Sequence, residues 1–469
     1  MPVTPFNHRA DPGAAPPFPP PGKLRLLIAL YELLWHLLLP LVGLFFWRRG
    51  QREPLYRQFW GERLGNTVTQ LHRPLWVHSA SMGEMRGAAP LVRALLDAGY
   101  PVLLTTLTPA GRTAAQSLFA AAMAEGRAQV AYVPLELGWA VRRFIRQVRP
   151  RAALMTEIDT WPVLLATIRR QGVPLGMANA QYPKKSFERD PRWGGFRAGL
   201  FQAYQLVLCK SETHAQRFRA VGCPWVVVAG ETRFDLPVSP QQLHAAQQLV
   251  QRWQLATGVP GGRPVVCFAS AIVGEDEPFL QAFAQVKAGL QQAGLAQPLA
   301  VYVPRSPQRF EAVAQLFEAA GLRVARRSRV LNADLALQDN TLIDPSVDVL
   351  LGDSLGEMYF YLALSQVVVV GASFVPMGAH NVIEPLALKK PVMVGPSIWG
   401  IEYPGVEALA AGVLQQHMTL DSLSAALVRV LTQPQAYAAA VSGAEAFFHE
   451  HGGATAKHMA VLGPWLEST

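Results

Sequence analysis

Short apolar runs alternate with amphipathic stretches along most of the chain. In the first half the apolar runs are LWVHSA, VLLTTL, QVAYVPL, RAALMTE, PLGMANA, LVLCKS and WVVVAG. Segments with apolar residues at helical spacing, such as APLVRALLDAG and WAVRRFIRQVRP, lie between most of them. A strand followed by a helix, repeated in this way, predicts a parallel sheet with helices on both faces.

A second series of the same kind occupies the rest of the chain. The segment DLPVSPQQLHAAQQLVQRW interrupts the pattern, and the runs VVCFAS, LAVYVP, VDVLLGD, QVVVVGA and PVMVGP follow it. The sequence therefore predicts an α/β fold with two Rossmann-like domains, residues 51–238 and 239–469, facing an interdomain cleft where ligands commonly bind. The last helix could pack back on the first domain.

The amino-terminal segment has a different character. Residues 1–22 are rich in proline and alanine, which predicts a disordered tail. The apolar run from Leu26 to Trp47 is long enough for a membrane helix, so we expect an anchor over residues 23–50. Whether this helix spans the membrane or lies in its interface stays open, and a buried core helix is the alternative. The run is interrupted by Glu32, His36 and Pro40.

Composition and charge narrow the class of protein. Hydrophobic residues make up 50% and charged residues 16%, which suggests that some apolar surface meets lipid. The net charge of +9 favours phosphates or an acidic membrane surface as partners. No nucleic-acid partner is predicted, because the basic residues are dispersed and no known nucleic-acid motif is present. A cytoplasmic location is indicated by the arginines that follow the anchor, Arg48, Arg49, Arg52, Arg57 and Arg63.

Cysteine usage and the absence of known motifs exclude several kinds of chemistry. Cys209, Cys223 and Cys267 have no metal or disulfide spacing, so we expect buried thiols in a reducing compartment. No Walker loop, HExxH, EF-hand, GxSxG or GxGxxG pattern is present. We therefore expect no nicotinamide cofactor, no zinc and no serine hydrolase chemistry.

Carboxylates follow two of the predicted strands in the first domain. The segment HSASMGEMRGAAP turns from a strand into a helix, and Glu84 lies near the start of that helix, where a carboxylate can accept a proton from an attacking hydroxyl. Alternatively, Glu84 only caps the helix. The segment LMTEIDTWP brings Glu157 and Asp159 to the end of a strand, either to bind hydroxyls and adjust the protonation of Glu84 or as a solvated loop.

Three segments at strand ends in the second domain suggest phosphate and nucleotide binding. VPRSPQRF places Arg305 after a strand, where a guanidinium suits a phosphate. LGDSLGEMY contains Asp353, Gly356 and Glu357. GASFVPMGAHNVIEP predicts a helix that starts near His380 and Asn381 and offers free amides to a phosphate, with Glu384 able to accept ribose hydroxyls. An ordinary helix start is the alternative.

Taken together, these segments resemble the Kdo transferase family, which adds 3-deoxy-D-manno-octulosonic acid (Kdo) to a lipid A precursor. The resemblance covers nearly the whole chain after about residue 24, in ERLG, WVHSASMGE, TTLTPAG, TEIDTWP, GETRFD, VPRSPQRF, GDSLGEMY and GAHNVIEP. It implies the two-domain GT-B glycosyltransferase fold, with the lipid acceptor on the first domain and the CMP-Kdo donor on the second. It also implies an inverting transfer without cofactor or bound metal, at the cytoplasmic face of the inner membrane.

The resemblance also implies roles for individual residues. Glu84 falls on the family's general base, and Glu157 and Arg233 fall on residues that stabilise the transition state. At position 233 the family usually has a lysine. The CMP-binding segments of the family fall on Pro304, Arg305, Gly356, Glu357, Met358, Asn381, Val382, Ile383 and Glu384.

The chain departs from the family pattern at several other positions. The family's NAR segment is NAQ here, and the departures include Gln181, Val163, Ile272, Ser306 and the pair Gly378–Ala379. They leave the sugar, the acceptor and the number of sugars added open. Two other functions therefore remain possible: a GT-B transferase that uses another CMP- or UDP-activated sugar on a lipid, and a degenerate, non-catalytic scaffold of envelope assembly.

Overall fold

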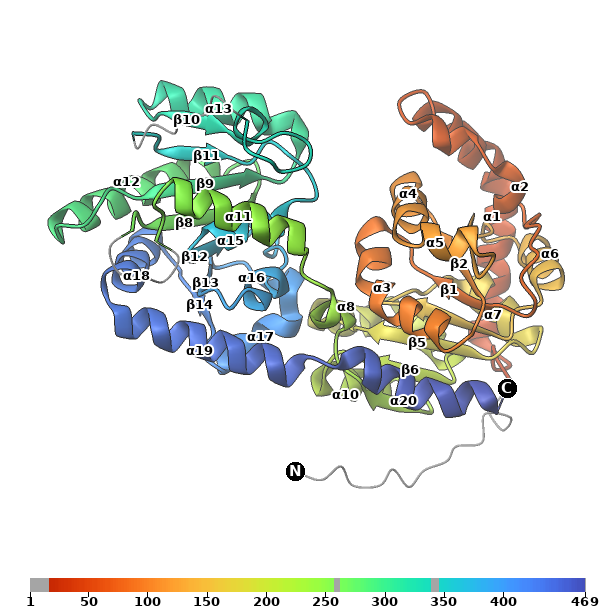
Figure 1. Ribbon diagram of the computed structural model, residues 1–469. Coiled ribbons are helices and arrows are strands. Elements are labelled where there is room, and N and C mark those ends of the chain that lie inside the picture. Colours follow the sequence, from red (N-terminus) through yellow and green to blue (C-terminus); the bar gives the residue numbers. More distant parts are fainter. Residues whose placement is uncertain (1–16, 257–261, 339–345, 469) are drawn as a thin grey trace. The chain divides into compact units, whose positions relative to one another are not determined.

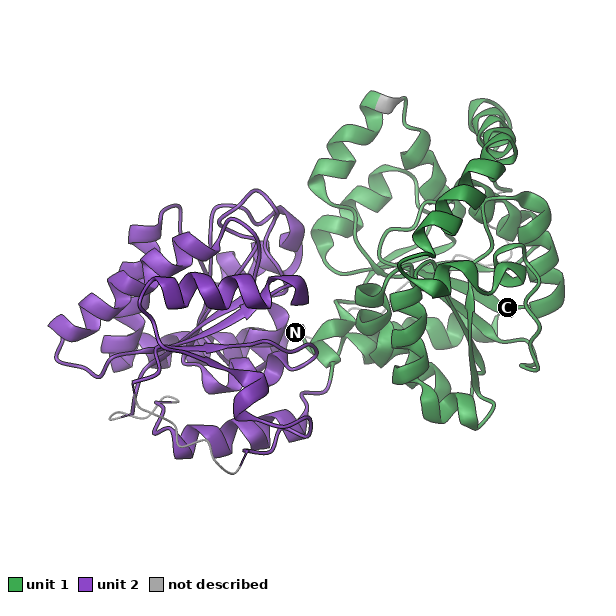
Figure 2. Ribbon diagram, turned by 90° about the horizontal axis from the view of Figure 1, so that it is seen from above, with its two compact units in different colours: residues 1–236, 452–469 green, residues 237–451 purple. Residues whose placement is uncertain are grey.

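The computed structural model describes residues 17–256, 262–338 and 346–468, and the chain folds into two units (Figures 1 and 2). Unit 1 contains Met1–Leu236 and Gly452–Thr469, and unit 2 contains Pro237–His451. The chain therefore returns to unit 1 for its last helix. Of the predicted tail, residues 1–16 lie outside the described residues, whereas Phe18 is buried in the core of unit 1.

The described part of unit 1 is built on a parallel sheet of seven strands in the order β3-β2-β1-β4-β5-β6-β7. The strands are nearly continuous apolar runs because helices cover both faces. The strand order reverses between β1 and β4, which makes their carboxyl ends the expected place for a ligand. The strands are β1 (Leu75–His78), β2 (Val102–Thr106), β3 (Ala128–Tyr132), β4 (Ala152–Thr156), β5 (Leu175–Ala180), β6 (Leu206–Cys209) and β7 (Val226–Val228).

Side chains that alternate along β1 point to opposite faces of this sheet and build two cores. Trp76 packs with Phe144 on one face, and Val77 packs with Leu95 and Trp465 on the other. The helices of unit 1 after α1 are α2 (Trp60–Arg63), α3 (Met82–Asp97), α4 (Pro109–Leu118), α5 (Ala120–Ala124), α6 (Gly138–Val148), α7 (Pro162–Arg170), α8 (Lys184–Arg189), α9 (Phe196–Leu200), α10 (Glu212–Ala220) and α20 (Ala454–Glu467).

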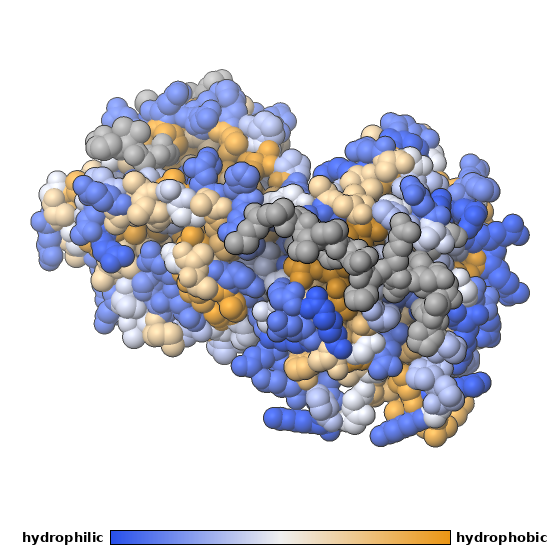
Figure 3. Space-filling view, turned by 90° about the horizontal axis from the view of Figure 1, so that it is seen from below, coloured by the Kyte–Doolittle hydropathy of each residue, from blue (hydrophilic) through white to orange (hydrophobic). Residues whose placement is uncertain are grey.

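The predicted anchor forms the helix α1 (Lys23–Arg49), which is long and apolar enough to cross a membrane. Only 6% of its most apolar window is buried, so α1 is not a core helix. It is attached to unit 1 by Glu32, whose Oε1 accepts a hydrogen bond of 2.9 Å from the Gly138 backbone N–H. On the face of the molecule drawn in Figure 3, apolar side chains are interspersed with polar ones. On α1, exposed large apolar side chains include Leu26, Leu30, Leu33, Leu37, Leu41, Leu44, Phe45 and Trp47.

The described part of unit 2 contains a second parallel sheet of seven strands, in the order β10-β11-β9-β8-β12-β13-β14. Its strand order reverses between β8 and β12. The two parallel sheets confirm the α/β fold. The strands are β8 (Val265–Ala271), β9 (Leu299–Pro304), β10 (Val324–Arg326), β11 (Val349–Leu351), β12 (Val367–Val370), β13 (Val392–Val394) and β14 (Leu414–Gln416).

Helices cover the sheet of unit 2 as well, and its core contains Phe268, Phe283 and Tyr302. Cys209, Cys223 and Cys267 are buried free thiols, as predicted. The helices are α11 (Pro240–Arg252), α12 (Asp276–Gln292), α13 (Phe310–Ala319), α14 (Arg327–Val330), α15 (Met358–Leu364), α16 (Ile383–Ala387), α17 (Glu402–Ala410), α18 (Leu420–Thr432) and α19 (Pro434–His451). Short 3₁₀ turns are η2 (Pro54–Arg57), η3 (Asp190–Trp193), η4 (Phe201–Ala203), η5 (Thr232–Asp235), η6 (Pro307–Arg309) and η7 (Trp399–Ile401).

Candidate functional site

Glu84 lies in the first turn of α3, directly after the turn that leaves β1. Its Oε2 accepts a hydrogen bond of 2.7 Å from the Ala80 N–H, and its Oε1 accepts one of 3.2 Å from the Ser81 hydroxyl. Ser81 in turn accepts from the Glu84 N–H and caps the helix. Glu84 therefore has the capping contacts that the alternative interpretation expected. Its side chain remains partly exposed, so the carboxylate is also accessible to a substrate.

Glu157 follows β4 directly and is buried beside Arg233. Its backbone has a φ of 65°, which turns the chain sharply at the strand end and is unusual for a residue with a side chain. The distance from Glu157 Oε1 to Arg233 Nη2 is 3.0 Å, and the same Nη2 donates to the Gly83 carbonyl at 3.2 Å. The structure thus brings Glu157 and Arg233 to the helix turn that carries Glu84.

Two further charged residues, which the sequence analysis did not single out, complete this group. Lys210 follows β6 and Glu231 follows β7, and both side chains are almost fully buried. The Lys210 ammonium lies 2.5 Å from Glu157 Oε2 and 2.6 Å from Glu231 Oε2. Arg233 Nη1 lies 3.3 Å from the same Glu231 oxygen. We call Glu157, Lys210, Glu231 and Arg233 the charged cluster.

The charges of the cluster act on the protonation of its members and of Glu84. Burial raises the pKa of Glu84 and the charge of Glu157 raises it further, while bonds from Ala80 and Ser81 and the charge of Arg233 oppose the rise. Burial alone would raise the pKa of Glu231, but the charges of Lys210 and Arg233 outweigh it and lower that pKa. For Arg233, burial is outweighed by the neighbouring carboxylates, so its pKa is raised and the guanidinium stays charged.

Asp159 and His78 form a second buried contact behind Glu84. His78 Nε2 lies 3.6 Å from Asp159 Oδ2. Burial lowers the pKa of His78 to about 4, and burial followed by the charge of Glu84 raises the pKa of Asp159 well above its ordinary value. The His78 imidazole is therefore neutral near neutral pH, so this contact is not an ion pair there. The Asp159 carbonyl accepts a bond of 2.7 Å from the Tyr204 hydroxyl, so the segment is not a solvated loop.

The position of Arg233 is fixed by segments that are distant in the sequence. Asn179 donates to the Thr232 hydroxyl at 2.6 Å and accepts from the Thr232 N–H at 3.0 Å. Asp235 accepts from Gly453 and Thr455 N–H groups at the start of α20, at 2.7 and 2.5 Å. A Cβ atom at Gly87 on α3 would come within 2.8 Å of Arg233 Nε, so the glycine makes room for the guanidinium.

The predicted nucleotide-binding residues of unit 2 follow the carboxyl ends of β9, β11 and β12, at one edge of the sheet. Pro304 is the buried last residue of β9, and Arg305 is exposed beyond it. Burial lowers the pKa of His380 to about 4, and the charge of Arg305 lowers it further. The segments that begin at residues 304 and 380 are therefore close enough for their charges to interact.

The segment after β11 is held largely by contacts within unit 2. Glu357 pairs with Arg327 at 2.5 Å and accepts from the Ser354 hydroxyl. Gly356 has a φ of 81°, and its carbonyl accepts from Gln242 of α11 at 2.9 Å. Met358 begins α15. Glu357 is therefore already engaged by protein groups, whereas Gly356 is exposed.

The segment after β12 differs in detail from the prediction. The helix α16 starts at Ile383, two residues later than predicted, because Asn381 forms a turn in which its Oδ1 accepts from the Ile383 N–H at 2.9 Å. One of the amides predicted to be free therefore already has a partner. Val382 and Ile383 are buried, so neither residue is exposed to a ligand. Glu384 lies near Tyr359, whose pKa is raised by burial and then by that carboxylate.

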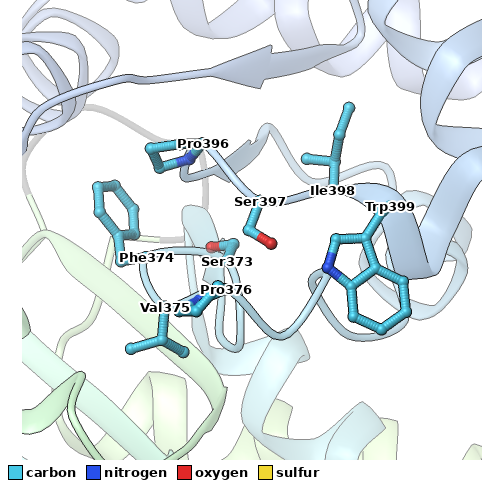
Figure 4. A pocket seen from close by; sticks show the side chains of 8 residues that line it. All are labelled: Ser373, Phe374, Val375, Pro376, Pro396, Ser397, Ile398 and Trp399. Atoms are coloured by element: carbon cyan, nitrogen blue, oxygen red, sulfur yellow. The ribbon is translucent and has the colours of Figure 1, made fainter.

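Glu275 organises the loop after β12 and was not predicted. Its fully buried carboxylate accepts hydrogen bonds from four backbone N–H groups. These belong to Ile272, Ala372, Ser373 and Phe374, at 2.7–3.0 Å. Next to this loop is an open pocket of about 510 Å³, drawn in Figure 4 with Phe374 at one end and Trp399 at the other. Its remaining lining residues are Ser373, Val375, Pro376, Pro396, Ser397 and Ile398.

Among the described residues, no group of three or more His, Cys, Asp or Glu side chains is placed to hold a metal ion. Two parallel α/β sheets, each with polar residues at the carboxyl ends of its central strands, define the class of the chain as a GT-B glycosyltransferase fold. A crystal structure of UDP-GlcNAc 2-epimerase from Neisseria meningitidis shares this fold with a TM-score of 0.51 and 13% identity, over 83% of this chain and 98% of that one.

Comparison of sequences identifies the family. The model of the 3-deoxy-D-manno-octulosonic-acid transferase family matches residues 58–236. The 3-deoxy-D-manno-octulosonic acid transferase of Bordetella pertussis is 35% identical, over 93% of this chain and 99% of that protein. The enzyme of the same name from Haemophilus influenzae is 28% identical, over 91% and 96%. The chain belongs to the Kdo transferase family.

Proposed function

We propose that this protein transfers Kdo from CMP-Kdo to a lipid A precursor at the cytoplasmic face of the inner membrane, with inversion at the anomeric carbon. One observation carries the proposal. In a chain of the Kdo transferase family, the accessible carboxylate of Glu84 lies at the β1–β4 switch point, against a buried cluster that holds Arg233.

Glu84 is the proposed general base. Burial and the Glu157 charge raise its pKa toward the range in which a carboxylate accepts a proton effectively. The bonds from Ala80 and Ser81 hold the carboxylate in one orientation. Glu84 removes the proton of the acceptor hydroxyl while that oxygen attacks the face of the sugar opposite the leaving phosphate, which inverts the configuration.

Arg233 and Glu157 are the proposed stabilisers of the transition state. Negative charge grows on the phosphate as the sugar–phosphate bond breaks, and a fixed guanidinium offsets it without having to reorganise. Glu157 and Glu231 keep the guanidinium charged and in place. Arginine at this position differs from lysine because its planar guanidinium can bind two carboxylates at once, one on each side.

The donor is proposed to bind at the edge of the sheet in unit 2. The exposed guanidinium of Arg305 suits a phosphate, and Glu384 can accept ribose hydroxyls. The other residues proposed to frame this edge are Pro304, Gly356, Glu357, Met358, Asn381, Val382 and Ile383. Glu357 pairs with Arg327, and Asn381 accepts a hydrogen bond from Ile383. Glu357 and Asn381 therefore support the binding loops.

The anchor gives the reaction its location. The apolar side chains of α1 are exposed to the surroundings, and arginines follow it closely, as expected for a cytoplasmic enzyme on a membrane helix. Attachment to the membrane that contains the lipid acceptor raises the local concentration of that substrate.

The test is incubation of the purified protein with CMP-Kdo and a tetraacylated lipid A precursor, followed by mass spectrometry of the lipid. We expect a mass gain of one or more Kdo residues. Glu84→Ala should abolish the gain while CMP still raises the melting temperature, because Glu84 belongs to unit 1 and the CMP residues to unit 2. Normal turnover by Glu84→Ala contradicts the assigned base, and transfer from UDP-sugars but not from CMP-Kdo contradicts the donor.

A further inference from the structure

A second cavity, in unit 1, lies outside the site described above. Its volume is about 460 Å³, within the range of small-molecule pockets. One wall is the helix α1, and the other consists of loops that follow β2, β3 and β4. The lining residues are Trp35, Leu38, Leu41, Val42, Phe45, Phe46, Arg63, Leu107, Val133, Pro134, Leu135, Glu136, Trp161 and Leu164.

Two charged residues, Glu136 and Arg63, interrupt this apolar lining. The Glu136 carboxylate accepts bonds of 2.9 Å from the N–H groups of Val163 and Leu164 at the start of α7. Arg63 is 1% exposed, and its Nε has no hydrogen-bond partner. The carboxylate of the adjacent Glu62 is bound by Arg112 at 2.6 Å.

The other contacts of Arg63 do not neutralise its charge. Its guanidinium lies over the rings of Phe46 and Tyr132, at 4.5 and 3.8 Å from their centres. Its terminal nitrogens reach the Leu107 carbonyl only at 3.5 Å, which is long for a hydrogen bond. The charge of Glu62 acts on Arg63, but that carboxylate is bound by Arg112. A buried cation without a carboxylate of its own is costly, so a ligand oxygen beside it would be stabilising. The cavity thus combines an apolar volume with one cation, Arg63, that oxygen atoms of a ligand would stabilise.

The cavity borders the apolar surface of α1 and shares a chain segment with the charged cluster. Leu38, Leu41 and Phe45 line it and are also exposed, so it opens onto the apolar surface of α1. Its inner loops leave the same sheet edge as Glu84. The segment from Glu157 to Trp161 has one end in the charged cluster and the other in the cavity, where Trp161 Nε1 donates to Asp159 at 3.2 Å.

We infer that this cavity binds one fatty acyl chain of the acceptor lipid, with Arg63 facing oxygen atoms at the polar end of that chain. The inference rests on the proposed function, because it assumes a lipid acceptor whose sugar reaches Glu84. A lipid seated there keeps its apolar chain against α1 and its polar part at the sheet edge that carries the base. The bound chain therefore sets which acylated acceptors are used and how they are oriented.

Two neighbouring leucines of α1 provide a matched test. Leu38 lines the cavity and is 39% exposed, so tryptophan at this position can enter the cavity without disturbing the core. Leu37 is 68% exposed and is not among the lining residues. Leu38→Trp and Leu37→Trp therefore make the same chemical change on the two sides of one helix turn.

The readouts are the KM for a tetraacylated acceptor and for its acyl-free counterpart, with CMP-Kdo as donor. Exclusion of even two methylenes predicts a KM for the acylated acceptor that is about tenfold higher in Leu38→Trp. The KM for the acyl-free acceptor and both constants of Leu37→Trp should be unchanged. Equal effects of the two variants, or an equal effect of Leu38→Trp on both acceptors, would overturn the inference.

Lipid binding without turnover separates this inference from the proposed function. Native mass spectrometry with the tetraacylated acceptor and no donor should show a lipid adduct for the wild type and Leu37→Trp, and a weaker one for Leu38→Trp. If the wild type transfers no Kdo but these adducts differ as expected, the proposed function fails and the cavity assignment stands. If Leu38→Trp weakens adducts of ordinary phospholipid equally, the cavity is a general lipid site and the inference is wrong.

Discussion

The ammonium of Lys210 lies 2.5 Å from Glu157 Oε2, and both side chains are buried. Glu231 shares the same ammonium, so one lysine balances two carboxylates while Arg233 approaches from the other side. The nearby Gln181 places its Oε1 3.3 Å from the Lys210 ammonium. Lys210 is therefore the central cation of the charged cluster, with two carboxylates and one amide oxygen as its partners.

Lys210→Gln is expected to shift the pH dependence of the reaction. Loss of the ammonium leaves excess negative charge near Glu84, and burial followed by the charge of Glu157 already raises the pKa of this proposed base. The acid limb of kcat/KM should therefore move to higher pH by about one unit. The double variant Gln181→Lys, Lys210→Gln should restore the profile, since its ammonium reaches the same place. Lower activity with an unchanged acid limb would mean that Lys210 acts on stability alone.

Gly87→Ala is expected to impair activity without destabilising the fold. The added Cβ displaces the Arg233 guanidinium, while alanine itself favours the helix α3. Misplacement of a catalytic group by about 1 Å can lower kcat about 100-fold. The matched control is Gly463→Ala on α20, where the new Cβ meets no atom within 4 Å. Full activity of Gly87→Ala would show that the position of Arg233 is not critical.

Glu275→Gln is expected to destabilise unit 2. A carboxylate accepts from four backbone N–H groups at this position, whereas an amide would turn its own donor toward some of them. The expected loss of unfolding free energy is about 3 kcal/mol, measured by denaturant unfolding. Thermal stabilisation by CMP should fall too, because the loop after β12 precedes the segment that contains Glu384. Exposed Glu277→Gln on the same helix should behave as the wild type, and equal stability of both variants contradicts the role of Glu275.

Stability should depend on pH through Glu136. Burial raises its pKa in the folded protein to about 7 from an ordinary value of 4.5, against the lowering effect of its bonds from Val163 and Leu164. The folded state thus favours the protonated form. The contribution of Glu136 to the free energy of unfolding is fully present below pH 4.5 and is lost as the pH rises through about 7.

The measurement for Glu136 compares denaturant unfolding of the wild type and Glu136→Gln across this pH range. As the pH rises from 4.5 to about 7, the free energy of unfolding of the wild type should fall by about 3 kcal/mol relative to that of the variant. The comparison with the variant removes the contribution of all other titrating groups. Parallel curves for the two proteins would show that Glu136 has the same pKa in the folded and unfolded states.

The sequence predicts the strands well where they are apolar runs, because a central strand must be buried on both faces. LWVHSA and QVVVVGA contain β1 and β12. The edge strands β10 and β14, with three residues each and partly exposed side chains, lack this pattern and were not predicted. Strand-end positions led to Glu84 and Glu157 and the family resemblance led to Arg233, but neither gave the distances between them.

The positions of Lys210 and Glu231 in the sequence could have identified them as candidate site residues. Each lies at or shortly after the end of a predicted strand, the same position that singled out Glu157. The sequence could not show that β4, β5 and β6 are neighbours in that order, and this order is what brings Lys210 to Glu157. The later start of α16 depends on the Asn381 side chain, which competes with the helix for the Ile383 amide.

The return of α20 to unit 1 has a consequence for how the protein is made. Leu462, Trp465 and Leu466 complete the core of unit 1, and α20 holds Asp235 beside Arg233. A ribosome synthesises these residues only after the whole of unit 2. Unit 2 can therefore fold before the core of unit 1 is complete, although most of unit 1 is synthesised earlier. A premature stop codon within unit 2 would thus damage unit 1 as well.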